Sequence, residues 1–347
     1  MNRNLALRGY SSLLTRTQAA VVQSGPNLTT PISLNVLNLS EHRIYKADVI
    51  NIHNTYNLIN YRFLEYSTYK QKIVFTLHDQ RAFTGACHYS YDCLQFVNSS
   101  CSSCPQVRKP FRRIVHNNYL RYSAALSKIN RIEVVAPSLW LTNLAQRSMA
   151  LKNASHHVIR NPASSEFLEP KESHKTNEKR LRIGFAAAYF ENPFKGLDVL
   201  SRSLHAIGNS DWFEKTEFVF IGSGNIGNLP NTLRYSTINA KSESEMRKVL
   251  QSLHLLVIPS VQDNFPNLIS EALLSGCELI TSDSGGLAEL ADELGYKTFP
   301  SGDSSTLADL LATFKPDLTH QQRRIETARK VFSPTSIAHS YLQVYKD

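Results

Sequence analysis

The chain has 347 residues, a length that favours two domains. Hydrophobic residues make up 42% and charged residues 19%, which supports a buried core and excludes a collagen-like or disordered protein. No apolar run approaches the roughly 18 residues of a membrane-spanning helix. The formal net charge of +9 indicates an anionic partner.

The excess charge lies in the first half of the chain. Residues 1–170 contain 19 Lys and Arg against 8 Asp and Glu, whereas residues 171–347 contain 19 against 21. The two halves are therefore expected to meet different partners. Residues 1–40 hold three arginines and no acid, but Arg8 and Gly9 interrupt their apolar residues. We therefore expect no secretory signal and a cytoplasmic protein.

Short apolar runs alternate with helical patterns, which predicts βαβ units and parallel sheets. Ser138 is a candidate N-cap of a helix that reaches about Met149. Another helix is expected from Pro266 to Leu274, with Gly276 as its C-cap. The predicted strands are 47–53, 72–78, 132–137, 157–160, 181–186, 217–222, 253–258 and 278–281.

The composition becomes polar between these two series of strands. We predict an α/β protein with two Rossmann-like domains and a central cleft, where ligands bind at the carboxyl ends of the strands. Its parts are an N-terminal domain over 1–165 with a cysteine-rich loop at 87–104, a linker over 166–180, a second domain over 181–325 and a C-terminal helix over 326–347.

The segment from Pro259 to Leu290 has the most informative spacing. A strand ends before Asp263, a helix opens at Phe265-Pro266-Asn267, and Glu271 lies eight residues after Asp263. A helix N-terminus suits a phosphate, and a carboxylate such as Glu271 can accept two hydrogen bonds from a ribose diol. After the next strand, Gly285 and Gly286 allow a close approach of the backbone to a ligand.

This segment resembles the E-x7-E signature of the family 4 glycosyltransferases, which are retaining enzymes of the GT-B fold. Asp263 stands in place of the first Glu, and Asn264 in place of a Gly. The residues on matching positions are Phe265, Pro266, Asn267, Glu271, Ala272, Leu273, Gly276, Gly285 and Gly286. The resemblance implies that Glu271 binds the donor ribose and that Asp263 contacts the donor sugar.

Further residues match the family upstream. Lys195 of a Lys-Gly pair takes the role of neutralising the donor diphosphate, and Gly222 and Gly224 match a short turn near the nucleotide. Many members carry an Arg shortly before the Lys, where this chain has Phe190 and Phe194. Part of the cationic clamp is therefore absent or supplied from elsewhere.

Two histidines end neighbouring predicted strands. His78, in Thr76-Leu77-His78-Asp79, matches a family residue that approaches the donor sugar, and the alternative is a His satisfied in a strand-end network. We assign His53 and Asp79 to the acceptor side of the site. The resemblance implies no protein nucleophile, and catalysis by positioning and charge stabilisation. No cofactor and no catalytic metal are expected, because the sequence has no Asp-x-Asp motif.

Four cysteines form the pattern C-x5-C-x7-C-x2-C: Cys87, Cys93, Cys101 and Cys104. Four thiolates would close a structural zinc site. Disulfides and four reduced thiols are the alternatives, and a reducing cytoplasm favours metal over disulfides. The run Phe-Thr-Gly-Ala-Cys-His-Tyr at 83–89, followed by this loop, is similar to a bacterial branch of the family that assembles exopolysaccharide and lipopolysaccharide, the colanic-acid type.

The basic segment 105–123 follows, with Arg108, Lys109, Arg112, Arg113 and Arg121 between apolar residues. Such a segment suits an anionic membrane surface, and the alternative is a solvated helix face. Nucleic acid is not expected, because the sequence has no finger spacing, RNP motif or helix-turn-helix signal.

The resemblance covers residues 45–345, but the first βα unit of the family, with its Gly-Gly loop, has no counterpart. It implies a transferase that moves a sugar from a nucleotide-sugar donor to a lipid-linked or saccharide acceptor at the inner face of the cytoplasmic membrane. The alternatives are a non-catalytic nucleotide-sugar-binding protein and a sugar-nucleotide epimerase.

Overall fold

The computed structural model describes residues 20–22, 47–53, 64, 71–169, 180–208 and 211–346. The chain divides into two compact units, one of residues 1–159 with 341–347 and one of residues 160–340. The expectation of a missing first βα unit concerns residues that lie, apart from 20–22, outside the described part.

The first unit is built on a parallel sheet, whose described strands follow the order β1-β2-β3-β4. All four predicted strands are confirmed, with small shifts at their ends. The central strand β2 is buried along its whole length, as expected of a parallel strand covered on both faces. The strands are β1 (Val49–Ile52), β2 (Lys72–Thr76), β3 (Ile132–Ala136) and β4 (Ser155–Val158).

Helices α3 (Gln95–Asn98), α4 (Arg112–Leu126) and α5 (Leu139–Arg147) belong to the same unit. The predicted N-cap is confirmed, because the Ser138 hydroxyl accepts a hydrogen bond from the Leu141 N–H at 3.1 Å. Helix α4 places Val115 and Tyr119 in the core of the unit, where both are buried.

The last residues of the chain complete this first unit. Helix α14 (Pro334–Lys346) begins in the second unit, but its residues from Tyr341 onward belong to the first. The buried Lys72 donates hydrogen bonds from Nζ to the carbonyls of Val344, at 2.9 Å, and Tyr345, at 3.4 Å. A cation at the carboxyl end of a helix satisfies carbonyls that lack a partner within the helix.

The second unit contains a parallel sheet whose described strands follow the order β10-β9-β8-β5-β6-β7. The four strands predicted here are confirmed, whereas β7 and β10 were not predicted. The strands are β5 (Leu181–Tyr189), β6 (Thr216–Ser223), β7 (Tyr235–Ile238), β8 (Leu255–Ile258), β9 (Glu278–Ser282) and β10 (Lys297–Phe299).

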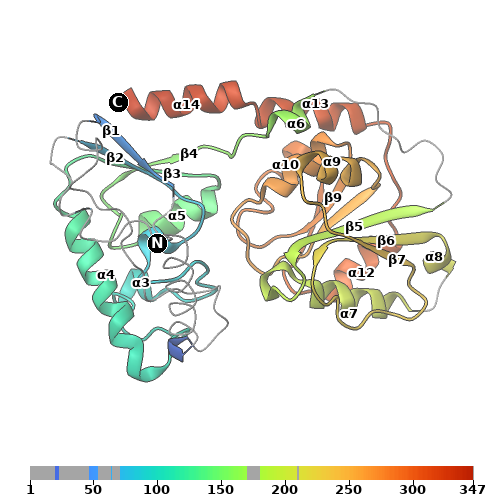
Figure 1. Ribbon diagram of the computed structural model, residues 1–347, viewed down its shortest axis with the longest axis horizontal. Coiled ribbons are helices and arrows are strands. Elements are labelled where there is room, and N and C mark those ends of the chain that lie inside the picture. The colour runs from blue at the N-terminus through green and yellow to red at the C-terminus, as the bar shows by residue number, and fades with distance from the viewer. Residues whose placement is uncertain are drawn as a thin grey trace, which may run out of the picture. The chain divides into compact units, whose positions relative to one another are not determined.

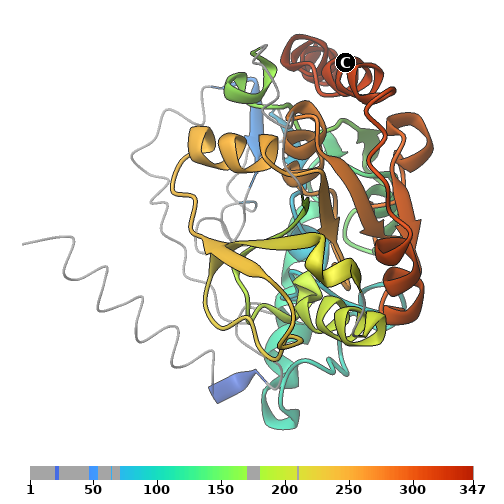
Figure 2. The same ribbon diagram turned by 90° about the vertical axis from the view of Figure 1, so that its right-hand side faces the viewer.

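Helices pack around this second sheet, and α7 lies against α12 (Figure 1 and Figure 2). The predicted helix from Pro266 is α10, with Pro266 as N-cap, Ser275 as C-cap and Gly276 just beyond at φ +75°. The helices are α6 (Ser165–Leu168), α7 (Leu197–Ile207), α8 (Asp211–Glu214), α9 (Glu243–Gln251), α10 (Asn267–Leu274), α11 (Ala291–Leu294), α12 (Ser304–Ala312) and α13 (Gln321–Val331).

The segment expected as a linker divides into two parts. Its first residues form α6, whose Phe167 is buried in the core of the second unit. Residues 170–179 lie outside the described part. The described portion is therefore a packed element of the second unit.

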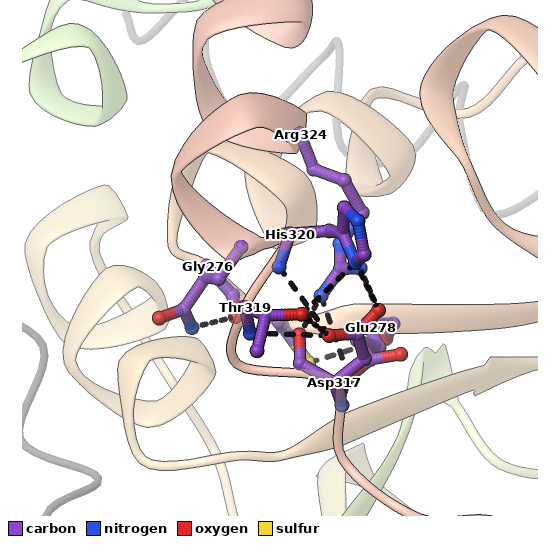
Figure 3. A network of polar contacts seen from close by, with 8 residues as sticks. Gly276, Glu278, Asp317, Thr319, His320 and Arg324 are labelled. Atoms are coloured by element: carbon purple, nitrogen blue, oxygen red, sulfur yellow. Dashed lines mark hydrogen bonds and ion pairs between the residues drawn. The ribbon is translucent and has the colours of Figure 1, made fainter.

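A polar network fixes α13 to strand β9 (Figure 3). The Asp317 carboxylate accepts hydrogen bonds from the N–H groups of Thr319 and His320, and Arg324 donates to the Asp317 carbonyl at 2.7 Å. Glu278 of β9 accepts from the Asp317 N–H at 2.6 Å and pairs with Arg324 at 3.4 Å. These contacts give the turn before α13 a single orientation on the sheet.

Candidate functional site

Lys195 lies in a 3-10 turn, Pro193–Lys195, just after β5. The next residue, Gly196, has φ +71°, and a Cβ there would stand 1.8 Å from the Pro259 carbonyl oxygen. Glycine is therefore required to hold the lysine loop against the end of β8. Phe190 and Phe194, at the positions expected for a second cation, are buried in the second unit and bring no charge.

Asp263 is the partner of Lys195. Lys195 Nζ donates to Asp263 Oδ2 at 2.7 Å, and the two side chains are 27% and 8% exposed. The other carboxylate oxygen, Oδ1, accepts the N–H of Asn264 at 3.0 Å. The ammonium is thus held at a fixed position while about a quarter of its side chain still faces solvent, where it can meet an anion.

The Gly285-Gly286 turn lies directly on Asp263. The Gly286 N–H donates to the Asp263 carbonyl at 3.1 Å. Gly285 has φ +64°, and a Cβ there would stand 1.9 Å from the same carbonyl oxygen. The structure therefore brings together Lys195, Asp263 and this turn from three different loops, which are the residues that the family resemblance assigns to the donor.

Helix α10 begins four residues after Asp263. Its N-cap residue Pro266 has no side-chain acceptor, so the first N–H groups of the helix receive no capping bond from it. Asn267, the first helical residue, is exposed, and its Oδ1 accepts from Asn161 Nδ2 at 3.0 Å. This helix end offers N–H groups and the positive end of the dipole to an anion.

Glu271 lies on the first turns of α10 and is partly exposed. Burial and, to a smaller extent, the negative charge of Glu243 together raise the pKa of Glu271 to about 7. Glu243, at the start of α9, accepts a hydrogen bond from the Ser164 hydroxyl at 2.8 Å. Sequence reasoning missed Glu243, whose only signal is its place in the first turn of a helix.

Arg160, a second residue that sequence reasoning missed, supports the start of α10 through Phe265. Arg160 pairs with Glu289 at 2.9 Å, and its guanidinium lies 5.0 Å from the centroid of the buried Phe265 ring. The Phe of Phe-Pro-Asn therefore anchors the start of α10, and it is not exposed to a ligand. Arg160 is the last residue of the predicted strand 157–160, where the pattern gave no sign of this role.

Gly222, near the end of β6, and Gly224, just after it, shape the turn that follows this strand. A Cβ on Gly222 would stand 1.7 Å from the Ala187 carbonyl oxygen, and one on Gly224 would stand 2.1 Å from Glu191 Oε2. Glu191 accepts the Asn225 N–H at 2.7 Å, a bond that lowers the pKa of Glu191. The loops after β5 and β6 border a pocket of about 470 Å³, whose lining includes Phe190, Glu191 and Asn225.

The first unit carries a separate histidine cluster at the ends of β1 and β2. His53 Nδ1 and His78 Nε2 are 3.1 Å apart, and burial lowers the pKa of both imidazoles. The adjacent Asp79 pairs with His88 at 2.5 Å and accepts the Arg81 N–H at 2.8 Å. Neutral rings at pH 7 can act as one donor and one acceptor in a shared hydrogen bond.

The predicted zinc loop and the basic segment also belong to the first unit. All five cysteines are described, and none is disulfide-bonded. Within the described residues, no group of three or more His, Cys, Asp or Glu side chains could hold a metal ion. In α4, Arg113 and Arg121 are exposed, whereas Val115 and Tyr119 face the core. No helix of the described residues is long and apolar enough to cross a membrane.

Residues 180–314 match the family described as Glycosyl transferases group 1. The match contains Lys195, Asp263, Glu271 and both glycine turns. No curated protein matches the chain significantly.

Solved structures share the whole architecture at low sequence identity. Sucrose-phosphate synthase from Thermosynechococcus elongatus aligns over 88% of this chain and 75% of its own, with 16% identity and a TM-score of 0.62. Anabaena Alr3699/HepE in complex with UDP aligns over 87% and 79%, with 15% identity and a TM-score of 0.59. The chain has the GT-B fold.

A third similar structure is the UDP-forming α,α-trehalose-phosphate synthase from Burkholderia xenovorans, in complex with glucose-6-phosphate. It aligns over 86% of this chain and 74% of its own, with 12% identity and a TM-score of 0.60. At this level of identity the likeness establishes the GT-B fold alone.

Proposed function

We propose that this chain is a retaining glycosyltransferase that moves a sugar from a nucleotide-sugar donor to a lipid-linked or saccharide acceptor in cell-surface polysaccharide assembly. The observation that carries the proposal is the ion pair between Lys195 and Asp263, at 2.7 Å. Asp263 packs on the Gly285-Gly286 turn and precedes the start of α10 by four residues. The match of residues 180–314 to Glycosyl transferases group 1 supports it, as do similar folds solved with UDP.

Each group of the donor would find a partner in the second unit. The Glu271 carboxylate accepts hydrogen bonds from the two ribose hydroxyls. The Lys195 ammonium and the N–H groups at the start of α10 compensate the diphosphate charge. Asp263 keeps the ammonium in place and offers its carboxylate to a donor-sugar hydroxyl.

The reaction itself requires little from protein nucleophiles. The acceptor hydroxyl attacks the anomeric carbon on the face that the diphosphate leaves, the bond from that carbon to the phosphate oxygen breaks, and the hydroxyl proton passes to the departing phosphate. Lys195 stabilises the charge that grows on the leaving group. The family resemblance assigns His78, which lies beside His53, to the transferred sugar, and no divalent metal is required.

The test is a transfer assay with a panel of nucleotide sugars and lipid-phosphate or saccharide acceptors, with Glu271→Ala as the control variant. We expect a glycosylated product whose anomeric configuration, read by NMR, equals that of the donor. Donor binding without transfer or hydrolysis would contradict the proposal and support a non-catalytic nucleotide-sugar-binding protein. An altered free sugar nucleotide formed without acceptor would indicate an epimerase.

A further inference from the structure

The pocket between the loops after β5 and β6 is also bordered by the start of α7, and it has a volume of about 470 Å³. This volume lies within the range of about 300–1,000 Å³ that is typical of small-molecule sites. The described residues that line it do not include Lys195, Asp263 or Glu271. The pocket is therefore separate from the groups assigned to the donor, and it can hold a ligand of its own.

Hydrogen bonds hold the walls of this pocket together. Glu191 Oε1 accepts the Asn225 N–H at 2.7 Å, which joins the two loops. The Ser201 hydroxyl of α7 donates to the Asn228 carbonyl at 2.5 Å, which joins the helix to the second loop. Gly224 permits the close approach, because a Cβ there would stand 2.1 Å from Glu191 Oε2. The pocket is therefore part of the fold of the second unit.

Two asparagine side chains of the lining are oriented through their oxygens. Asn192 Oδ1 accepts the Phe194 N–H at 3.0 Å, and Asn225 Oδ1 accepts the Gly227 N–H at 2.8 Å. With each oxygen fixed, the Nδ2 group of the same amide is the part that can donate to a ligand. The Glu191 carboxylate, which has two oxygens, can accept from a ligand while it holds Asn225.

The charges of the lining narrow the class of ligand. Glu191 and Asp198 bring two carboxylates, whereas Arg202 brings one guanidinium, which pairs with Asp198 at 2.9 Å. This lining repels phosphates and carboxylates, because its net charge is negative. The apolar side chains of the lining belong to Phe190, Leu197 and Ile226. The ligand that fits is therefore uncharged and carries both hydroxyl groups and apolar faces.

We propose that this pocket binds a neutral saccharide, as a mono- or disaccharide unit. The Glu191 carboxylate accepts hydrogen bonds from sugar hydroxyls, and the Nδ2 groups of Asn192 and Asn225 donate to them. The exposed pair of Asp198 and Arg202 supplies a further acceptor and further donors. The C–H faces of the sugar ring pack on the apolar side chains.

The pocket shares a turn with Lys195. The Asn192 carbonyl accepts the Lys195 N–H at 3.1 Å, and the Asn192 side chain caps the same 3-10 turn. If the proposed transferase function holds, the bound sugar is a unit of the saccharide acceptor or of the product, held next to the turn that carries the lysine. This consequence rests on the proposed function, whereas saccharide binding does not.

The first measurement is calorimetry on the full chain with glucose, galactose, mannose, maltose and lactose, each at up to high millimolar concentration. We expect at least one of these sugars to bind, and the double variant Asp198→Ala with Arg202→Ala to lower its affinity about fivefold or more. Glu326→Ala with Lys330→Ala removes the same two charges at the same spacing from exposed positions of α13 and should leave the affinity unchanged.

The second measurement needs no variant that could fail to fold. It follows the side-chain amide signals of Asn192 and Asn225 by NMR in the full chain labelled with ¹⁵N-asparagine, during titration with the same sugars. Both signals should shift. The Asn161 side-chain amide, which donates to Asn267 at the start of α10, is the internal reference and should not shift.

Three results overturn the proposal: no binding of any of these sugars, equal binding by the Asp198/Arg202 variant, or shifts at Asn192 and Asn225 caused by inorganic phosphate and not by sugars. Transfer activity together with any of these results leaves the proposed function standing. Saccharide binding at these residues without transfer activity leaves the pocket assignment standing and counts against the proposed function alone.

Discussion

The Lys195 ammonium lies 2.7 Å from Asp263 and keeps 27% of its side chain exposed. We expect Lys195→Ala to lower kcat/KM by about 10²–10³-fold, because a cation that stabilises a developing charge acts mainly in the transition state. Steady-state kinetics with donor and acceptor measure it. Lys330→Ala, which removes an exposed cation of α13 in the same unit, is the matched control.

Lys330→Ala should change kcat/KM less than twofold, because a single exposed charge contributes little. An equal loss in both variants would mean that Lys195 acts through general stability or overall charge. Lys195→Arg should recover only part of the activity, since the guanidinium is larger and differs in geometry from the ammonium.

Glu271 gives a second residue-scale prediction, in the pH dependence of donor binding. Its pKa of about 7 lies above the usual carboxyl value, so the carboxylate that accepts the ribose hydroxyls forms only as the pH rises through 7. We expect donor affinity, measured by calorimetry, to rise about tenfold from pH 6 to pH 8. Nucleotide-sugar diphosphate diesters do not titrate in this range.

Two variants test this assignment. Glu243→Gln removes a negative charge that raises the Glu271 pKa, so the rise in affinity should move to lower pH. Glu271→Gln should bind more weakly and show no rise at all. A pH profile that persists in Glu271→Gln would assign the titration to another group.

For individual residues, the sequence predicts which residue types and which loops form the site. It does not predict which side chains bond to each other. His53 and His78 end neighbouring parallel strands, so their contact follows from the predicted sheet. Lys195 and Asp263 are 68 residues apart, and their hydrogen bond depends on how Gly196 fits against Pro259. Glu243 and Arg160 carried no usable signal, since single charged residues at helix starts and loop ends are common.

At the scale of elements, the turn after β9 depends on glycine. Gly285→Ala would place a Cβ 1.9 Å from the Asp263 carbonyl at φ +64°, so the turn has to move away from Asp263. We expect a loss of about 2–4 kcal/mol in unfolding free energy and much weaker donor binding, measured by denaturant titration and calorimetry.

Gly302→Ala is the control for that prediction, because Gly302 has φ +83° but nothing within 4 Å of the added Cβ. It should cost only about 1 kcal/mol, the conformational penalty alone, and leave donor affinity intact. If both variants behave alike, backbone strain rather than the contact with Asp263 determines the effect.

Elements with a continuous apolar run could be predicted, and those without one could not. Strands such as β2 and β8 are buried along their whole length and stand out as apolar runs. The edge strand β7, with the sequence Tyr-Ser-Thr-Ile and half of its residues exposed, gives no such run. Helix α6 went unpredicted because its four residues lie in a polar stretch, although Phe167 is buried.

At the scale of the whole molecule, the charge asymmetry separates the two units. The basic segment 105–123 was expected to be amphipathic, and α4, which it contains in part, has basic residues on one side and apolar residues on the other. The apolar Val115 and Tyr119, however, are buried in the core of the first unit. Of its large apolar residues, Leu120 is 44% exposed, beside the exposed Arg121. Contact of this helix with a membrane would thus be electrostatic, with little apolar insertion.

We therefore expect the chain to bind anionic phospholipid vesicles weakly and in a salt-dependent way. Each basic residue near such a surface contributes about 1 kcal/mol, so Arg113→Glu with Arg121→Glu should reduce binding at least tenfold in vesicle sedimentation. Lys241→Glu with Lys248→Glu makes the same charge change at exposed sites of the second unit and should leave binding nearly unchanged.

The comparison of the two double variants separates local from global electrostatics. Both change the net charge equally, so equal losses would mean that total charge alone attracts the protein, and the assignment of α4 would be wrong. Binding that survives high salt would require apolar insertion, which the packing of α4 does not provide. A loss confined to the α4 variant would place the lipid-facing surface on the unit that carries the histidine cluster, where a lipid-linked acceptor would be met.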